Sequence, residues 1–135
     1  MIEIEFRAKS IGGEWVYGVL MPFWNRDKEI KMYCIIPYNI GLTKDTSIWE
    51  IQIQVDPDTI GQFTGKRDEN AKKIYTGDIV HNGERAMEVI FHNAAFRILA
   101  QGHDRNNAMT IYEASQKWIL NKIGNVHDNP ELLNV

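Results

Sequence analysis

Residues 74–100 read IYTGDIVHNGERAMEVIFHNAAFRILA, and this stretch decides the fold that we expect. Short apolar runs alternate in it with turn signals, of which Asn82-Gly83 is the strongest because both residue types tolerate a positive φ angle. Turns about ten residues apart are typical of a small meander, sandwich or barrel. We therefore expect three strands, over residues 74–81 with a break at Gly77-Asp78, 85–91 and 95–100.

The sequence before this stretch alternates apolar and polar residues with the period of a β-strand. It predicts strands over residues 2–8, 15–23, 29–36 and 48–55, and an irregular connection over 38–47. In the last of these strands, alternate residues share one face, which should be buried: Trp49, Ile51, Ile53 and Val55.

The end of the chain mixes two patterns. Residues 109–123 fit either a helical stripe or a strand face, and we favour a strand over 119–127 after a short helical turn. Asn129-Pro130 then predicts one final turn, because proline suits the first helical position.

Size and charge restrict the function classes. The 135 residues allow one domain or two small lobes. With 15 basic and 18 acidic residues, the chain lacks the overall positive electrostatic field that drives non-specific nucleic-acid binding. The N-terminus alternates like a strand and no apolar run is long enough for a membrane span, so we expect no membrane association. The single cysteine, Cys34, removes any argument for a disulfide scaffold and favours a reducing compartment, so we expect a cytoplasmic protein.

Three segments carry a family resemblance: residues 4–8, residues 55–65 continuing to 74–80, and residues 123–133. Together they resemble the YopX family of phage and prophage proteins. The resemblance implies an SH3-type barrel in the C-terminal part and a bacterial host cell, and it gives no catalytic activity that could be carried over to residues of this chain. The fold class that we predict is mainly β, with a small N-terminal β lobe over residues 1–60 and an SH3-like barrel over 61–135.

One departure from the family pattern has a physical consequence. Asn70-Ala71 stands where the family has Asn-Gly. A two-residue turn with positive φ at both positions would penalise alanine by roughly 1 kcal/mol relative to glycine. We therefore expect a different turn geometry here.

Candidate catalytic groups are scattered. His81, His92 and His103 recur every eleven residues, but a meander places His92 about 20 Å from the other two, too far for a shared zinc. A pair of His81 and His103 with His127 or Asp104 stays open. The acidic pairs of residues 56–58 and 68–69 suit turns, and Cys34 suits a core strand. We expect no catalytic, cofactor-binding or metal-binding residue, and a hydrolase with an unrecognised site is the third hypothesis.

Two binding hypotheses remain. Aromatic residues anchor protein interfaces, and the four tryptophans are candidates for one, although core packing explains them equally well: Trp15, Trp24, Trp49 and Trp118. The first hypothesis is therefore a non-enzymatic module that binds protein, either itself as a homo-oligomer or a phage or host protein. The second is weak nucleic-acid binding by a basic cluster near Phe63 and Tyr75: Lys66, Arg67, Lys72 and Lys73.

Overall fold

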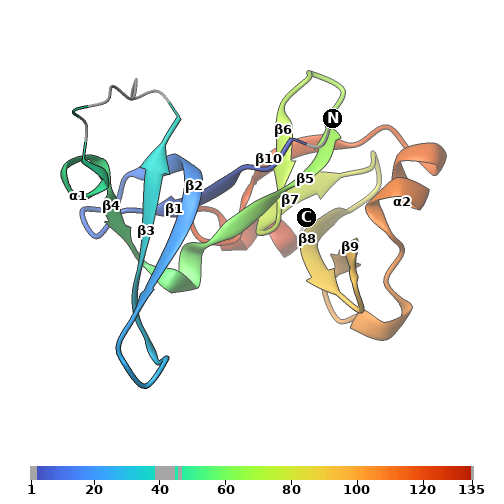
Figure 1. Cartoon of the computed structure of the whole chain (residues 1–135). Helices are drawn as coiled ribbons and strands as arrows, with labels where there is room; N and C mark the ends of the chain where they lie inside the picture. The colour runs from blue at the N-terminus through green and yellow to red at the C-terminus, as the bar shows by residue number, and fades with distance from the viewer. Residues whose placement is uncertain (1–2, 39–44, 46, 135) are drawn as a thin grey trace. The chain divides into compact units, whose positions relative to one another are not determined.

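The computed structural model describes residues 3–38, 45 and 47–134, and the chain divides into two compact units, residues 1–62 and 63–135 (Figure 1). Most of the connection expected over residues 38–47 lies outside the described residues. Strands dominate both units, which confirms the mainly β fold class.

The first unit is an antiparallel sheet in the order β4-β3-β2-β1, extended by Gly61 and Gln62 at the start of β5. Its strands are β1 (Phe6–Lys9), β2 (Trp15–Trp24), β3 (Ile30–Pro37), β4 (Ile53–Val55) and the first two residues of β5 (Gly61–Arg67). Ala8, Ile35 and Val55 form its buried core. The sequence predicted strands where β1, β2 and β3 lie, because apolar and polar residues alternate there as they do in a strand with one buried face.

The strand expected over residues 48–55 is wrong in its first half. Residues Ile48–Ile51 form the short helix α1, and only Ile53–Val55 extend as β4. The amide of Glu50 donates to the carbonyl of Ser47, which turns the chain. Val55 is buried as expected, and Ile51 and Ile53 are half-buried, whereas the side chain of Trp49 lies outside the described residues.

In the second unit, β5 pairs with β6, while β10, β7, β8 and β9 form a four-stranded antiparallel sheet in that order. The elements are β6 (Lys73–Tyr75), β7 (Asp78–His81), β8 (Ala86–His92), β9 (Ala95–Ala100), η2 (Arg105–Asn107), α2 (Ile111–Lys117), β10 (Asn121–Asn125) and η3 (Pro130–Asn134). The final turn was predicted, and the break expected at Gly77-Asp78 lies one residue earlier, at Thr76-Gly77 between β6 and β7.

The closed barrel expected here is wrong. After β9 the chain forms η2 and α2, and it then returns to β7 at the opposite edge of the sheet. Because the next strand does not extend the sheet at β9, the sheet stays open. Thr110 begins α2 with a capping box shared with Glu113, which explains why the helical alternative holds over 111–117.

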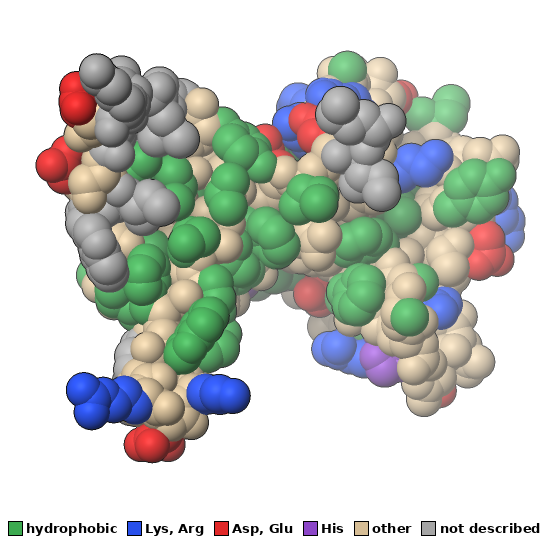
Figure 2. All heavy atoms as spheres, viewed as in Figure 1, with side chains coloured by type: hydrophobic (Ala, Val, Ile, Leu, Met, Phe, Trp, Pro, Cys, Tyr) green, Lys and Arg blue, Asp and Glu red, His purple; other side chains and the backbone are tan. Residues whose placement is uncertain are grey.

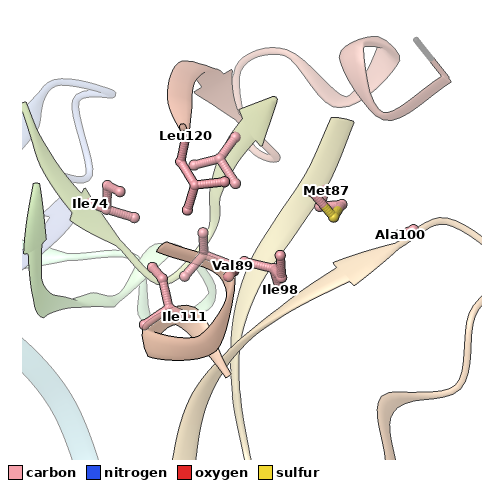
Figure 3. Close-up of a cluster of buried hydrophobic side chains, with 9 residues drawn as sticks. Ile74, Met87, Val89, Ile98, Ala100, Ile111 and Leu120 are labelled. Atoms are coloured by element: carbon pink, nitrogen blue, oxygen red, sulfur yellow. The ribbon is translucent and has the colours of Figure 1, made fainter. Parts of the chain in front are cut away.

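The core of the second unit lies where the sheet, β6 and α2 meet (Figure 3). Ile111 and Ala114 from one face of α2 are buried there, since residues three apart lie on the same side of a helix. The sheet, β6 and the residue before β10 supply the remaining buried side chains: Ile74, Val80, Met87, Val89, Ile98, Ala100 and Leu120.

Two hairpin turns differ from the expected ones. The β7–β8 hairpin leaves four residues between His81 and Ala86, and there Gly83 has a φ of 97° while the Asn82 side chain accepts the amides of Glu84 and Arg85. The turn with positive φ at both positions is instead Asn93-Ala94, at 50° and 59°. Asn82-Gly83 is therefore part of a longer loop, because its asparagine caps local amides.

The turn at Asn70-Ala71 also has a distinct geometry, as expected. The amide of Ala71 donates to the carbonyl of Asp68 at 3.0 Å, and Ala71 alone in this turn has a positive φ, of 64°. A type I turn followed by a left-handed residue usually has glycine at that last position. The strain is therefore confined to one residue.

Ala71→Gly is expected to raise the free energy of unfolding of the second unit by about 1 kcal/mol, because relief of left-handed strain exceeds the added chain entropy. Ala108→Gly is the matched control, since Ala108 has a φ of −67°. It should lower that free energy by about 0.5 kcal/mol. Urea titrations followed by circular dichroism measure both, and equal destabilisation by the two variants would contradict the strained turn.

Candidate functional site

The first candidate surface is the hairpin arm, defined as residues 19–32. β1 pairs with β2 only over Trp15–Gly18, and β4 pairs with β3 only over Tyr33–Ile35, so the hairpin extends past both neighbouring strands. Within it, most strand residues are apolar: Val19, Leu20, Met21, Pro22, Phe23, Trp24, Ile30 and Met32.

Three of these side chains are strongly exposed. Trp24 is 59% exposed, Ile30 50% and Val19 44%. Trp24 and Ile30 are cross-strand partners, so their side chains lie on the same face near the end of the arm. Large apolar side chains exposed together are typical of an interaction surface.

The tip of the arm is polar, and local hydrogen bonds close its turn. The Asn25 side chain accepts the amides of Asp27 at 2.9 Å and Glu29 at 3.1 Å. Residues 26–29 carry two positive and two negative charges, and Figure 2 shows charged side chains of both signs at this end, beside hydrophobic ones. The arm is thus apolar along its length and charged at its tip.

The other tryptophans predicted as interface residues lie in different environments. Trp15 is half-buried, with the Arg7 guanidinium 4.7 Å from its ring centre. Trp118 is half-buried against the core of the second unit. The side chain of Trp49 is outside the described residues, so Trp24 is the tryptophan that the described surface presents most fully. The exposure of Ile30 was missed, since alternation does not reveal where a neighbouring strand ends.

The four basic residues predicted as a nucleic-acid site lie on β5, on β6 and in the turn between these strands. Arg67 and Lys73 are cross-strand partners on β5 and β6. The Lys73 ammonium lies 5.3 Å from the centre of the Phe63 ring, and the Lys66 ammonium lies 5.2 Å from that of Tyr112. Lys72 is exposed in the turn that joins the two strands.

Of the two acids among these basic residues, Asp68 is turned inward and is 8% exposed. Its carboxylate accepts the amides of Asn70 and Lys72 within the turn and that of Lys122 on β10. Burial by itself would raise the pKa of Asp68, but these hydrogen bonds and the charge of Lys72 lower the pKa below its usual value. Asp68 therefore stays ionised and fastens the turn to β10.

Beside this turn lies a groove of about 410 Å³, within the size range of ligand pockets. We name it the α2 groove, because Ser115 and the residues that follow α2 form one side. Its lining combines charged and aliphatic residues: Lys66, Arg67, Asp68, Glu69, Ile74, Ile111, Ser115, Trp118, Ile119 and Leu120. Ile119 is 72% exposed. Sequence reasoning missed this groove, because α2 brings residues 111–120 beside 66–74.

A larger hollow of about 540 Å³ lies on the other side of Trp118. Its apolar part includes Met87, Ile98 and Met109, and a guanidinium nitrogen of Arg85 lies 3.1 Å from His103 Nε2 at its rim. The rim is mixed in charge, since Glu84 and Asp104 also line it. This arrangement favours no single class of ligand.

The histidines have separate local partners. His81 Nδ1 accepts the amide of Gly83 at 3.0 Å, and His92 Nε2 lies 2.8 Å from Asn106 Oδ1. Within residues 3–38, 45 and 47–134, no three His, Cys, Asp or Glu side chains gather as a metal site would require. His81 and His103 therefore do not gather a third such ligand there.

Two other titratable groups have perturbed pKa values for structural reasons. Burial raises the pKa of the Cys34 thiol, which disfavours the nucleophilic thiolate. Burial also raises the pKa of Glu88, although the positive charge of Arg105 opposes this effect. Neither residue has the neighbouring base of a nucleophilic site among the contacts described for it.

A family model described as YopX protein matches residues 5–134. The chain belongs to the YopX family. The family resemblance seen in the sequence is thereby confirmed over nearly the whole chain. Among the described residues of this YopX-family protein, no helix combines the length and apolar character needed to cross a bilayer.

The fold of this YopX-family protein is also found in protein EF1440 from Enterococcus faecalis. That crystal structure is similar with a TM-score of 0.56 and 23% sequence identity, over 98% of this chain and 99% of that chain. At this identity the likeness shows the fold alone. A comparison with curated proteins found no match.

Proposed function

We propose that this YopX-family protein is a non-enzymatic accessory module of phage or prophage origin that acts in the host cytoplasm and binds a second copy of itself through the hairpin arm. The observation that carries the proposal is the exposed apolar pair of Trp24 and Ile30 on a hairpin that extends past its neighbouring strands.

Burial of the arm would stabilise both the arm and the assembly. A two-stranded ribbon in water is marginally stable, so a covering partner lowers its free energy. Trp24 exposes more than half of its surface and Ile30 exposes half. Aromatic residues such as Trp24 supply much of the binding energy at protein interfaces.

The charges at the tip favour a second copy over an unrelated partner. Arg26 and Lys28 alternate with Asp27 and Glu29 at the end of the arm. A two-fold dimer brings the same surface of each copy together, so the cations of one tip can face the anions of the other. A tip that carries equal numbers of positive and negative side chains can therefore pair with an identical tip.

The test is the mass of the whole chain in solution as a function of concentration, measured by sedimentation equilibrium. The wild type should form dimers, and Trp24→Ser combined with Ile30→Ser should weaken association by about thirty-fold, the effect of losing about 2 kcal/mol at a hot spot. The matched control is Ile11→Ser, because Ile11 is 67% exposed in the same unit but outside the arm.

The controls make the outcome decisive. At concentrations at which the wild type is monomeric, circular dichroism should show unchanged unfolding of the double variant, because both replaced side chains are exposed in the single chain. A wild type that stays monomeric at every concentration would refute self-association. Equal weakening by Ile11→Ser would show that the arm is not the interface.

A further inference from the structure

We propose that the α2 groove binds an acidic peptide segment of another protein, with an aliphatic side chain of that peptide inserted between Ile111, Ile119 and Leu120. This site lies in the second unit and is carried by observations independent of the hairpin arm.

The apolar part of the α2 groove is aliphatic. Ile74, Ile111 and Leu120 are core residues that are 1%, 5% and 6% exposed, yet each also lines the groove. Ile119 stands beside them with 72% of its surface exposed. An inserted aliphatic side chain would remove this exposed apolar surface from water, which is the main driving force of association.

The charges on the rim favour an anionic partner. Lys66 and Arg67 line the groove, and the ammonium of Lys117 lies 4.8 Å from the centre of the Trp118 ring. Of the two acids in the lining, Asp68 is turned inward onto three backbone amides, which leaves Glu69 as the exposed one. The charge of Lys72, in the same turn, offsets that of the ionised Asp68, which leaves the two cations Lys66 and Arg67 against Glu69 at the rim.

The acidity of the chain does not oppose such a partner. Residues 63–135 contain nine basic and nine acidic residues, whereas residues 1–62 contain six and nine. The net negative charge thus comes from the first unit, and the second unit is neutral overall. A neutral unit with a cationic rim attracts acidic segments at short range.

The same geometry favours a peptide over a nucleic acid. Binding of single strands depends on open aromatic faces on which bases stack. The one aromatic residue in the lining is Trp118, which is half-buried against the core, and the nearby Tyr112 ring has the Lys66 ammonium over it. Aliphatic side chains, not open rings, form the apolar surface here.

The test uses the whole chain and a fluorescein-labelled peptide in which two central leucines are flanked by glutamates, with binding followed by fluorescence anisotropy. Lys66→Glu should weaken binding about ten-fold, and Ile119→Ser about five-fold. Arg105→Glu is the charge-matched control, because Arg105 is exposed in the same unit outside the groove lining, and it should change the affinity less than two-fold, within the roughly 0.5 kcal/mol of a surface substitution.

Three further measurements decide between the explanations. A peptide with both leucines replaced by serine should bind about five-fold more weakly, and equal binding would refute insertion of a side chain. Tighter binding of labelled oligothymidylate that is lost in Lys66→Glu would overturn the peptide in favour of a nucleic acid. The arm variant with Trp24→Ser and Ile30→Ser should bind the peptide as tightly as the wild type does. If neither the wild type nor the arm variant binds the peptide, the proposed site is refuted.

Discussion

Gly18→Ala is expected to destabilise the first unit by about 3 kcal/mol, at the upper end of the cost of overpacking. A Cβ atom at position 18 would overlap the carbonyl oxygen of Ile36 and lie 2.8 Å from its carbonyl carbon. Gly18 pairs with Phe6 on one side and with Pro37 on the other, in a strand that lies between two neighbours. The neighbouring backbone therefore has to shift to admit the methyl group.

The matched control for this prediction is Gly12→Ala. A Cβ at position 12 would meet only the Ser10 hydroxyl oxygen, at 3.7 Å, which is ordinary van der Waals contact. Its effect should stay within about 0.5 kcal/mol. Urea titration and hydrogen exchange of the β2 and β3 amides measure both variants. If Gly18→Ala were as stable as Gly12→Ala, the close approach of β2 and β3 would be wrong.

Asp78→Ala should destabilise the second unit by about 3 kcal/mol. Asp78 is fully buried, and its Oδ2 accepts the amide of Tyr75 at 2.7 Å and lies 3.1 Å from the Lys122 ammonium. The carboxylate thus connects β6, β7 and β10. Its loss removes the counter-charge of Lys122, whose side chain is 21% exposed and therefore retains some contact with water. For that reason we expect a loss of unfolding free energy at the lower end of the roughly 3–5 kcal/mol that removal of one partner from a buried ion pair usually causes.

Glu84→Ala is the control for Asp78→Ala, because Glu84 is an exposed acid in the same unit. It should change the free energy of unfolding by less than about 0.5 kcal/mol. Adding Lys122→Met to Asp78→Ala should restore part of the lost stability, since the double variant leaves no ammonium without its carboxylate. Chemical denaturation of the three variants measures these values. Equal stability of Asp78→Ala and Glu84→Ala would show that the buried ion pair contributes nothing.

Much of the β architecture was predictable because local patterns decide it. The alternation of β1, β2 and β3 and the turns around β7, β8 and β9 reflect which side chains face a core. α1 was not predictable in this way, because residues 48–51 alternate like a strand. Pairing of this segment with β3 begins only at Ile53. The α2 groove was equally hidden, because its two sides come from residues 66–74 and 111–120.

The sequence by itself determined the family, the mainly β class, a strand break near Gly77 and a changed turn geometry at Asn70-Ala71, because each follows from residue types that lie next to one another in the chain. Only the tertiary structure decided that the sheet of the second unit stays open, that Trp24 is exposed while Trp118 packs on a core, and that Lys66 borders an aliphatic groove. These depend on contacts between distant segments. A local pattern gives the face that a side chain occupies, but it does not give what covers that face.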